Sequence, residues 1–155
     1  MGGRSLNELF ADNEGAPITV DGRLLHSSYE RQVLGGTRFV VTRVSTHSRY
    51  LQGLEVKVEK AAQLSIDGVR SRGFKLWENQ ARARLTIDVV AKGPTTLRVW
   101  NLWLVDSVEW AWSHDASILV DESPGGDQVT LRCRDGFSPP DYDNLVIQLH
   151  FEAST

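Results

Sequence analysis

The sequence predicts an all-β fold, an antiparallel two-sheet β-sandwich of jelly-roll type with one short N-terminal helix. Three observations predict it: apolar and polar residues alternate with a period of two, the alternating runs are short, and clusters rich in Gly, Pro and Asp separate them. Short strands with regular turns are typical of sandwiches and barrels. We expect a helical segment over residues 1–15 and a single sandwich domain over residues 16–155.

The expected helix begins at an S-x-x-E capping box made by Ser5 and Glu8, ahead of Leu9 and Phe10. In such a box the serine side chain accepts a hydrogen bond from the backbone three residues later, which satisfies a donor that the helix leaves unpaired. A helix this short is expected to form only a tail or a lid on the sandwich.

The clearest strand signal lies in residues 81–91, where every odd position is apolar and most even positions are polar. Because successive side chains of a strand point to opposite faces, one face is expected to be buried and the other hydrated. Residues 54–58, 128–133 and 144–151 alternate in the same way. The apolar set of the first run is Ala81, Ala83, Leu85, Ile87, Val89 and Ala91.

Two further runs, residues 37–44 and 95–105, are more continuously apolar, as expected of central strands that are covered on both faces. Turn-forming residues separate the runs and predict the ends of the strands. They are Asp21-Gly22, Gly35-Gly36, Asp67-Gly68, Lys92-Gly93-Pro94, Pro124-Gly125-Gly126 and Asp135-Gly136.

Composition predicts one globular domain, since 155 residues with 41% apolar residues suffice for a core. Cys133 is the only cysteine, so the chain has no intramolecular disulfide and no cysteine-cluster metal site, which favours a reducing compartment. Residues 1–13 do not resemble an export signal, and no run approaches the ~18 to 20 apolar residues of a membrane-spanning helix. We therefore expect a cytoplasmic protein.

Charge is distributed unevenly along the chain. Residues 106–143 contain nine acidic and two basic residues, a net charge of −7, whereas residues 1–105 have a net charge of +5. Within the acidic part, a Gly- and Pro-rich loop carries the oxygen-bearing side chains of Asp135, Asp141, Asp143 and Asn144. Because Ca²⁺ takes about six to eight oxygen ligands, this loop predicts a divalent-cation site with Asp141 and Asp143 as principal ligands.

The segment Asp141-Tyr142-Asp143-Asn144-Leu145, followed by Val146 and Ile147, resembles the D-[FY]-[ND]-D-L-V segment that opens a strand in several bacterial β-sandwich families thought to bind calcium. The resemblance implies a calcium ion at this loop. In those families the position that matches Asn144 is usually Asp, so this chain offers one charge less. A structural alternative stays open, because Asp and Asn side chains in turns also accept hydrogen bonds from nearby backbone N–H groups.

Four tryptophans, Trp100, Trp103, Trp110 and Trp112, fall within thirteen residues. Trp110 and Trp112, two positions apart on one strand, are expected to project from the same face. Trp100 and Trp103 differ in strand parity, so one is expected to face inward and the other outward. An exposed tryptophan would provide a platform for a sugar ring, whereas core packing is the alternative because large aromatic rings are usually buried.

Other chemistry has weaker signals. The four histidines are scattered without metal-ligand spacing. Ser113, His114 and Asp115 are neighbours on the chain, so alternation prevents them from forming a catalytic triad. Cys133 is in phase with Val129 and is expected to be a buried hydrophobic residue.

Arg82 and Arg84 share the polar face of one expected strand, but the net charge of −3 and the intervening acidic residues argue against nucleic acid as a partner. The leading hypothesis is a non-catalytic binding module with a calcium-like loop and a tryptophan face for a carbohydrate. The second is an intracellular accessory domain that binds a protein partner, or a second copy of itself, without an ion. An enzyme with an acidic active site built from Asp115, Asp135 and Asp141 is the least supported hypothesis.

Overall fold

The computed structural model describes residues 4–137 and 142–152. Within these residues the chain forms one helix, α1 (Leu6–Asp12), and fourteen strands. The strands are β1 (Ile18–Val20), β2 (Arg23–Leu25), β3 (Tyr29–Leu34), β4 (Arg38–Thr46), β5 (Leu51–Lys57), β6 (Gln63–Ile66), β7 (Val69–Ser71), β8 (Gly73–Trp77), β9 (Arg84–Val90), β10 (Pro94–Val105), β11 (Val108–Trp110), β12 (Ser117–Glu122), β13 (Gln128–Arg134) and β14 (Leu145–Phe151).

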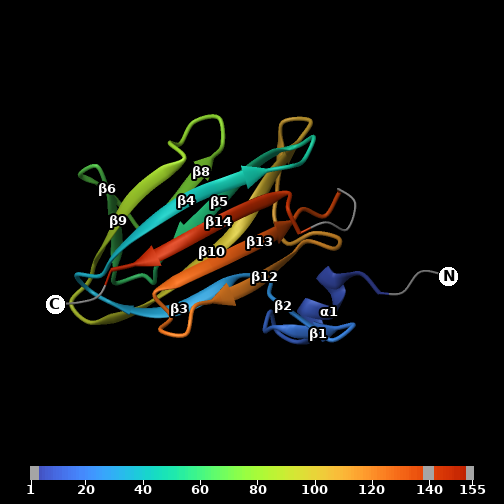
Figure 1. The fold of residues 1–155 in the computed structure, drawn as a ribbon, viewed down its shortest axis with the longest axis horizontal. Helices are drawn as coiled ribbons and strands as arrows, with labels where there is room; N and C mark the ends of the chain where they lie inside the picture. Colours follow the sequence, from blue (N-terminus) through green and yellow to red (C-terminus); the bar gives the residue numbers. More distant parts are fainter. Residues whose placement is uncertain (1–3, 138–141, 153–155) are drawn as a thin grey trace.

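The strands form two main sheets that pack face to face (Figure 1). The larger sheet has seven strands in the order β12-β13-β14-β4-β9-β6-β7, and the smaller has five, with β11-β10-β5-β8 in line and β3 also paired with β10. The pairings within both sheets are antiparallel. The prediction of an all-β sandwich with one short helix at the N-terminus is therefore confirmed, while its jelly-roll type is not.

The core lies between the inner faces of the two sheets and follows the predicted alternation. On β13, Val129, Leu131 and Cys133 are fully buried, and on β10 Leu97 and Val99 face them from the smaller sheet. Burial of these apolar faces supplies the main favourable free energy of folding, at roughly 25 cal/mol per Å² of apolar surface. The predicted inward position of Cys133 is confirmed.

The two sheets are joined at one edge by the chain itself. β7 belongs to the larger sheet and β8 to the smaller, and Arg72 alone separates them. The side chain of Ser71 donates a hydrogen bond to the carbonyl oxygen of Gly73 at 2.8 Å and holds this corner. At the opposite edge the phenol of Tyr29, on β3, donates to a carboxylate oxygen of Glu122, on β12, at 3.0 Å.

The N-terminal part lies beside β12, outside the sandwich (Figure 1). The predicted capping box is present, since the Ser5 hydroxyl accepts a hydrogen bond from the backbone N–H of Glu8 at 3.3 Å. Leu6, Phe10 and Leu25 form a small second core between α1 and the β1–β2 hairpin. No helix in the described part of the chain has the length and apolar character needed to cross a membrane.

Candidate binding groove

Two neighbouring pockets run from the outer face of β10 round to the sandwich edge between β3 and β12. The first, the helix pocket, has a volume of about 720 Å³ and lies between α1, the 14–17 turn, the 26–30 segment and β12. The second, the sheet pocket, has a volume of about 640 Å³ and lies over β5 and β10. Ser28, Arg98 and Trp112 line both pockets, so we treat the two as one groove.

Alternation along β10 determines which side chains reach this groove. Leu97 and Val99 point into the core, so Arg98 and Trp100 point to the opposite face of the sheet. Trp100 is nevertheless only 7% exposed, because the ring of Trp112 packs on it with a centroid distance of 4.9 Å and an interplanar angle of 31°. The outward-facing tryptophan therefore forms the base on which a second tryptophan rests.

Trp112 is the most distinctive residue of the groove. The residue is 47% exposed, and its backbone has φ of 54°, the left-handed region that bulky residues avoid at a cost of about 1–2 kcal/mol. Its indole N–H donates a hydrogen bond to the carbonyl oxygen of Ser27 at 3.0 Å. The backbone, the hydrogen bond and the tilted ring contact with Trp100 together hold the indole in one orientation at the junction of the two pockets.

The two pockets differ in charge. The helix pocket contains the carboxylates of Glu14, Glu30 and Glu122 with Arg98 as its basic residue, and Arg98 lies 3.2 Å from Glu30. Burial lowers the pKa of His26 below its ordinary value of 6.5, and the nearby carboxylate of Glu122 only partly opposes this. His26 is therefore mainly neutral at pH 7 and does not offset the acidic groups.

The sheet pocket has acidic and basic side chains in alternation. Its charged residues besides Arg98 are Glu55, Lys57, Glu59, Lys60, Arg72 and Glu109. Burial raises the pKa of Glu55, while Lys75 and Lys57 act in the opposite direction. This pocket therefore offers hydrogen-bond donors and acceptors without a strong net charge.

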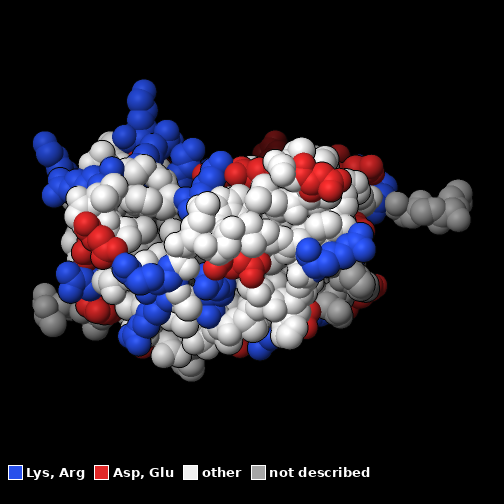
Figure 2. Space-filling view, turned by 90° about the horizontal axis from the view of Figure 1, so that it is seen from above, with Lys and Arg blue, Asp and Glu red and all other residues white. Residues whose placement is uncertain are grey.

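Basic side chains gather at the end of the molecule where β6 and β9 lie, as Figure 2 shows on the left, and acidic side chains are more frequent toward the right. Arg82, which the sequence analysis placed on a strand with Arg84, instead lies in the segment before β9 and pairs with Asp67 at 2.8 Å. Its charge is thus compensated on the surface. This arrangement is that of a solvated face with local ion pairs.

Trp103 and Trp110 lie on the other side of the smaller sheet. Trp103 is fully buried on the inner face, so the expected opposite orientations of Trp100 and Trp103 are confirmed. Trp110 pairs opposite Trp103 and packs on Phe137, with a ring-centroid distance of 5.3 Å. The expectation that Trp110 and Trp112 share a face is wrong, because β11 ends at Trp110 and the positive φ of Trp112 turns its ring to the outer face.

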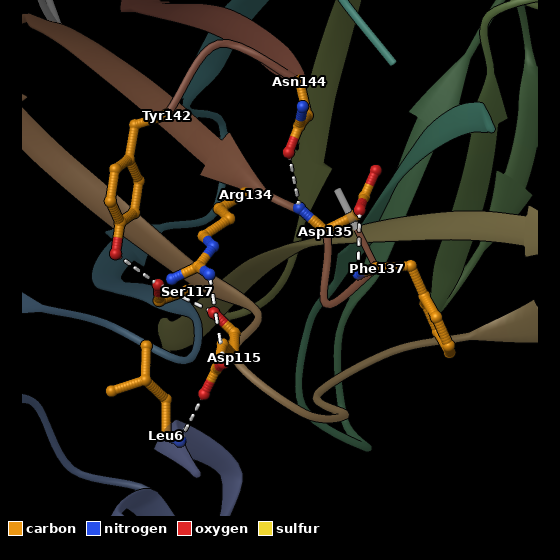
Figure 3. Close-up of polar contacts among 8 residues, drawn as sticks. All are labelled: Leu6, Asp115, Ser117, Arg134, Asp135, Phe137, Tyr142 and Asn144. Carbon is orange, nitrogen blue, oxygen red and sulfur yellow. Dashed lines mark hydrogen bonds and ion pairs between the residues drawn. The ribbon is translucent and has the colours of Figure 1, made fainter. Parts of the chain in front are cut away.

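The acidic loop begins at Asp135, which continues the inward register of β13 and is fully buried. One of its carboxylate oxygens, Oδ2, accepts hydrogen bonds from the Ser48 hydroxyl at 2.7 Å and from the Gln52 amide at 3.0 Å. The other, Oδ1, accepts from the backbone N–H of Phe137 at 3.0 Å (Figure 3). The carboxylate thus joins the start of the loop to the segment that enters β5.

Asn144 lies next to Asp135. Its side-chain oxygen accepts from the backbone N–H of Asp135 at 3.0 Å, and its amide donates to the carbonyl oxygen of His47 at 2.8 Å (Figure 3). Asp143 is half-buried, and Asp141 lies outside the described residues. No group of three or more His, Cys, Asp or Glu side chains that could hold a metal occurs in residues 4–137 and 142–152.

The calcium site consequently stays a prediction that rests mainly on Asp141 and Asp143. Asp115 belongs to a separate network, in which one carboxylate oxygen accepts from the backbone N–H of Leu6 at 3.0 Å and the other lies 3.9 Å from the Arg134 guanidinium. Figure 3 shows this network and that of Asp135 on different sides of the chain, because Arg134 and Asp135 are consecutive and point in opposite directions.

Comparison with known proteins gives no match to a protein-family model, to a curated protein or to a solved structure. The groove and the acidic loop are therefore interpreted from their own geometry. Of the groove residues, the sequence pointed to Trp100 and Trp112. It carried no signal for Ser27, Arg98 or Glu122, which come together only through the pairing of distant strands.

Proposed function

We propose that this protein is a non-catalytic binding module that holds a carbohydrate chain in the groove, with Trp112 as the stacking platform. The observation that carries the proposal is the half-exposed indole of Trp112 at the junction of two pockets, fixed by Trp100 and Ser27. A side chain needed only for packing would be expected to bury more of its ring, since large aromatic side chains are mostly buried in folded proteins.

A fixed aromatic ring suits a sugar for two physical reasons. The C–H groups on one face of a pyranose are attracted to the electron-rich face of an indole, and the ring buries a large apolar area on contact. Because Trp112 is already immobilised, binding costs little additional side-chain entropy. Glu55 and Lys57, two positions apart on the same face of β5, supply an acceptor and a donor for hydroxyl groups.

The experiment is a glycan-array screen followed by titration of the best oligosaccharide, with tryptophan fluorescence as the readout. Trp112→Ala is expected to lower affinity by at least about 2- to 12-fold, because the ~0.5–1.5 kcal/mol that an aromatic contact contributes beyond buried area is lost together with the buried area itself. Trp110→Phe is the matched control, because it alters a tryptophan on the opposite face of the sheet. The proposal fails if no glycan binds, or if Trp112→Ala binds as well as the unaltered protein.

Two further parts of the proposal come from the sequence. We infer that the protein acts in the cytoplasm, where the single Cys133 would stay reduced, and cell fractionation tests this location. We also keep Ca²⁺ as the ion of the acidic loop, bound through Asp141 and Asp143. This ion would act at a different place from the groove, so calcium binding and sugar binding are tested separately.

A further inference from the structure

We propose that the helix pocket selects a sugar unit with a free, protonated amino group, so that the ligand class is an oligosaccharide containing unacetylated amino sugars. This inference rests on the proposed function, because it assigns the charge of the sugar that stacks on Trp112. Glu14, Glu122 and the indole of Trp112 are the groups that would recognise the ammonium.

The uncompensated charge of the helix pocket is negative. The guanidinium of Arg98 is 3.2 Å from the carboxylate of Glu30, so these two charges largely cancel. Glu14 and Glu122 form no ion pair within residues 4–137 and 142–152. Two carboxylates therefore remain to attract a cation into the pocket, over a range of about 8–10 Å at moderate salt.

The polar neighbours of Glu122 leave room for an ammonium donor. Tyr29 donates its phenolic hydrogen to one carboxylate oxygen at 3.0 Å, and the other oxygen accepts no hydrogen bond within the described part of the chain. Arg31 donates to the Tyr29 hydroxyl at 3.4 Å and to the carbonyl oxygen of Gly126, and its guanidinium covers the ring of Phe151 at 3.8 Å. Its charge therefore offsets part of that of Glu122 through Tyr29, although the two form no ion pair in the described part of the chain. Because burial lowers the pKa of His26, its imidazole takes up a proton less readily than a free histidine and repels a cation less.

Trp112 adds a second attraction for the same group. The face of an indole attracts a cation through its quadrupole, and tryptophan is the strongest of the aromatic side chains in this respect. Because Trp112 lines the helix pocket as well as the sheet pocket, an amino sugar in the first pocket would lie beside the ring on which its neighbour stacks. An N-acetyl group removes the charge and with it both attractions.

The test compares three β-1,4-linked tetrasaccharides at about pH 6, where the amine is protonated: those of glucosamine, of N-acetylglucosamine and of glucose. Calorimetric titration is expected to show the glucosamine tetramer binding about tenfold more tightly than either neutral tetramer, with the preference reduced by added salt. The double variant Glu14→Gln, Glu122→Gln should remove this preference, so that the glucosamine tetramer binds no more tightly than the two neutral tetramers.

Asp121→Asn is the matched control, since Asp121 is adjacent to Glu122 on β12 but points to the outer face of the sheet. The Asp121→Asn variant should prefer the glucosamine tetramer as strongly as the unaltered protein does. Thermal unfolding checks that each variant is folded. If the three tetramers bind equally and Trp112→Ala weakens them all, the charge inference is overturned while the proposed function stands. If none binds, the charge inference is overturned, and the glycan-array screen decides separately on the proposed function. A tetralysine peptide that binds as tightly as the glucosamine tetramer would overturn the sugar class.

Discussion

Replacing Asp135 by alanine should destabilise the fold by about 3 kcal/mol. The buried carboxylate accepts hydrogen bonds from Ser48, Gln52 and the backbone of Phe137, and a hydrogen bond to a charged group contributes ~1.5–3 kcal/mol. Adding the contributions of all three hydrogen bonds would overestimate the loss of stability for two reasons. The Gln52 amide keeps a second acceptor, the carbonyl oxygen of Tyr50 at 3.1 Å, and removing a buried charge relieves its desolvation cost.

For a chain of this size, 1 kcal/mol corresponds to roughly 2–4 °C, so the midpoint of thermal unfolding should fall by about 6–12 °C. Scanning calorimetry in the presence of a chelator measures the change without any contribution from a bound cation. Asp143→Ala is the control, since it removes a half-buried carboxylate from the same loop and should alter stability by less than about 0.5 kcal/mol. A midpoint for Asp135→Ala within about 2 °C of the unaltered protein would refute the hydrogen-bond reasoning.

Three other predictions concern packing, pH and calcium. Gly35→Ala should lower the free energy of unfolding in urea by about 1–3 kcal/mol, because the added Cβ would lie 1.9 Å from the carbonyl oxygen of Ala91. Gly93→Ala, whose added Cβ meets nothing within 4 Å, should be nearly neutral. Equal effects of the two substitutions would contradict the packing argument. The pKa of His26 is lowered in the folded protein, so the unfolded chain binds a proton at this residue more readily. The free energy of unfolding should therefore fall as the pH drops below 6.5. In His26→Gln this fall should be less steep. If the loop binds Ca²⁺, a free Ca²⁺ concentration of about 100 times the dissociation constant should raise the free energy of unfolding by about 2.7 kcal/mol. Asp143→Ala should reduce that gain. An unfolding midpoint that is equal in calcium and in chelator, measured by calorimetry, would exclude the site.

The sequence predicted the fold class because alternation is local and strong. The inward residues of β13 are in phase from Val129 to Cys133, and the same phase extends to Asp135. This alternation predicts that the side chain of Asp135 points inward. The carboxylate, however, led to the interpretation of Asp135 as a metal ligand. The expected strand over residues 81–91 begins only at Arg84, because Ala81 donates its backbone N–H to the carbonyl oxygen of Trp77 in a turn.

The candidate groove was predicted only in part. The outward position of Trp100 followed from strand parity, since β10 is regular over this stretch. The orientation of Trp112 did not follow, because a positive φ in a bulky residue has no sequence signature. The acidic character of the helix pocket also could not be predicted, as Glu14, Glu30 and Glu122 come from segments far apart in the sequence.

The one-residue passage through Arg72 has a mechanical consequence for the molecule. At that corner the covalent connection keeps β7 and β8 within the reach of a single residue, so this edge of the sandwich stays closed. The opposite rim, where Tyr29 and Glu122 meet, is joined by a side-chain hydrogen bond between β3 and β12. Since the helix pocket lies at that rim and both residues line it, losing this hydrogen bond would alter the pocket lining while the Arg72 corner stays in place.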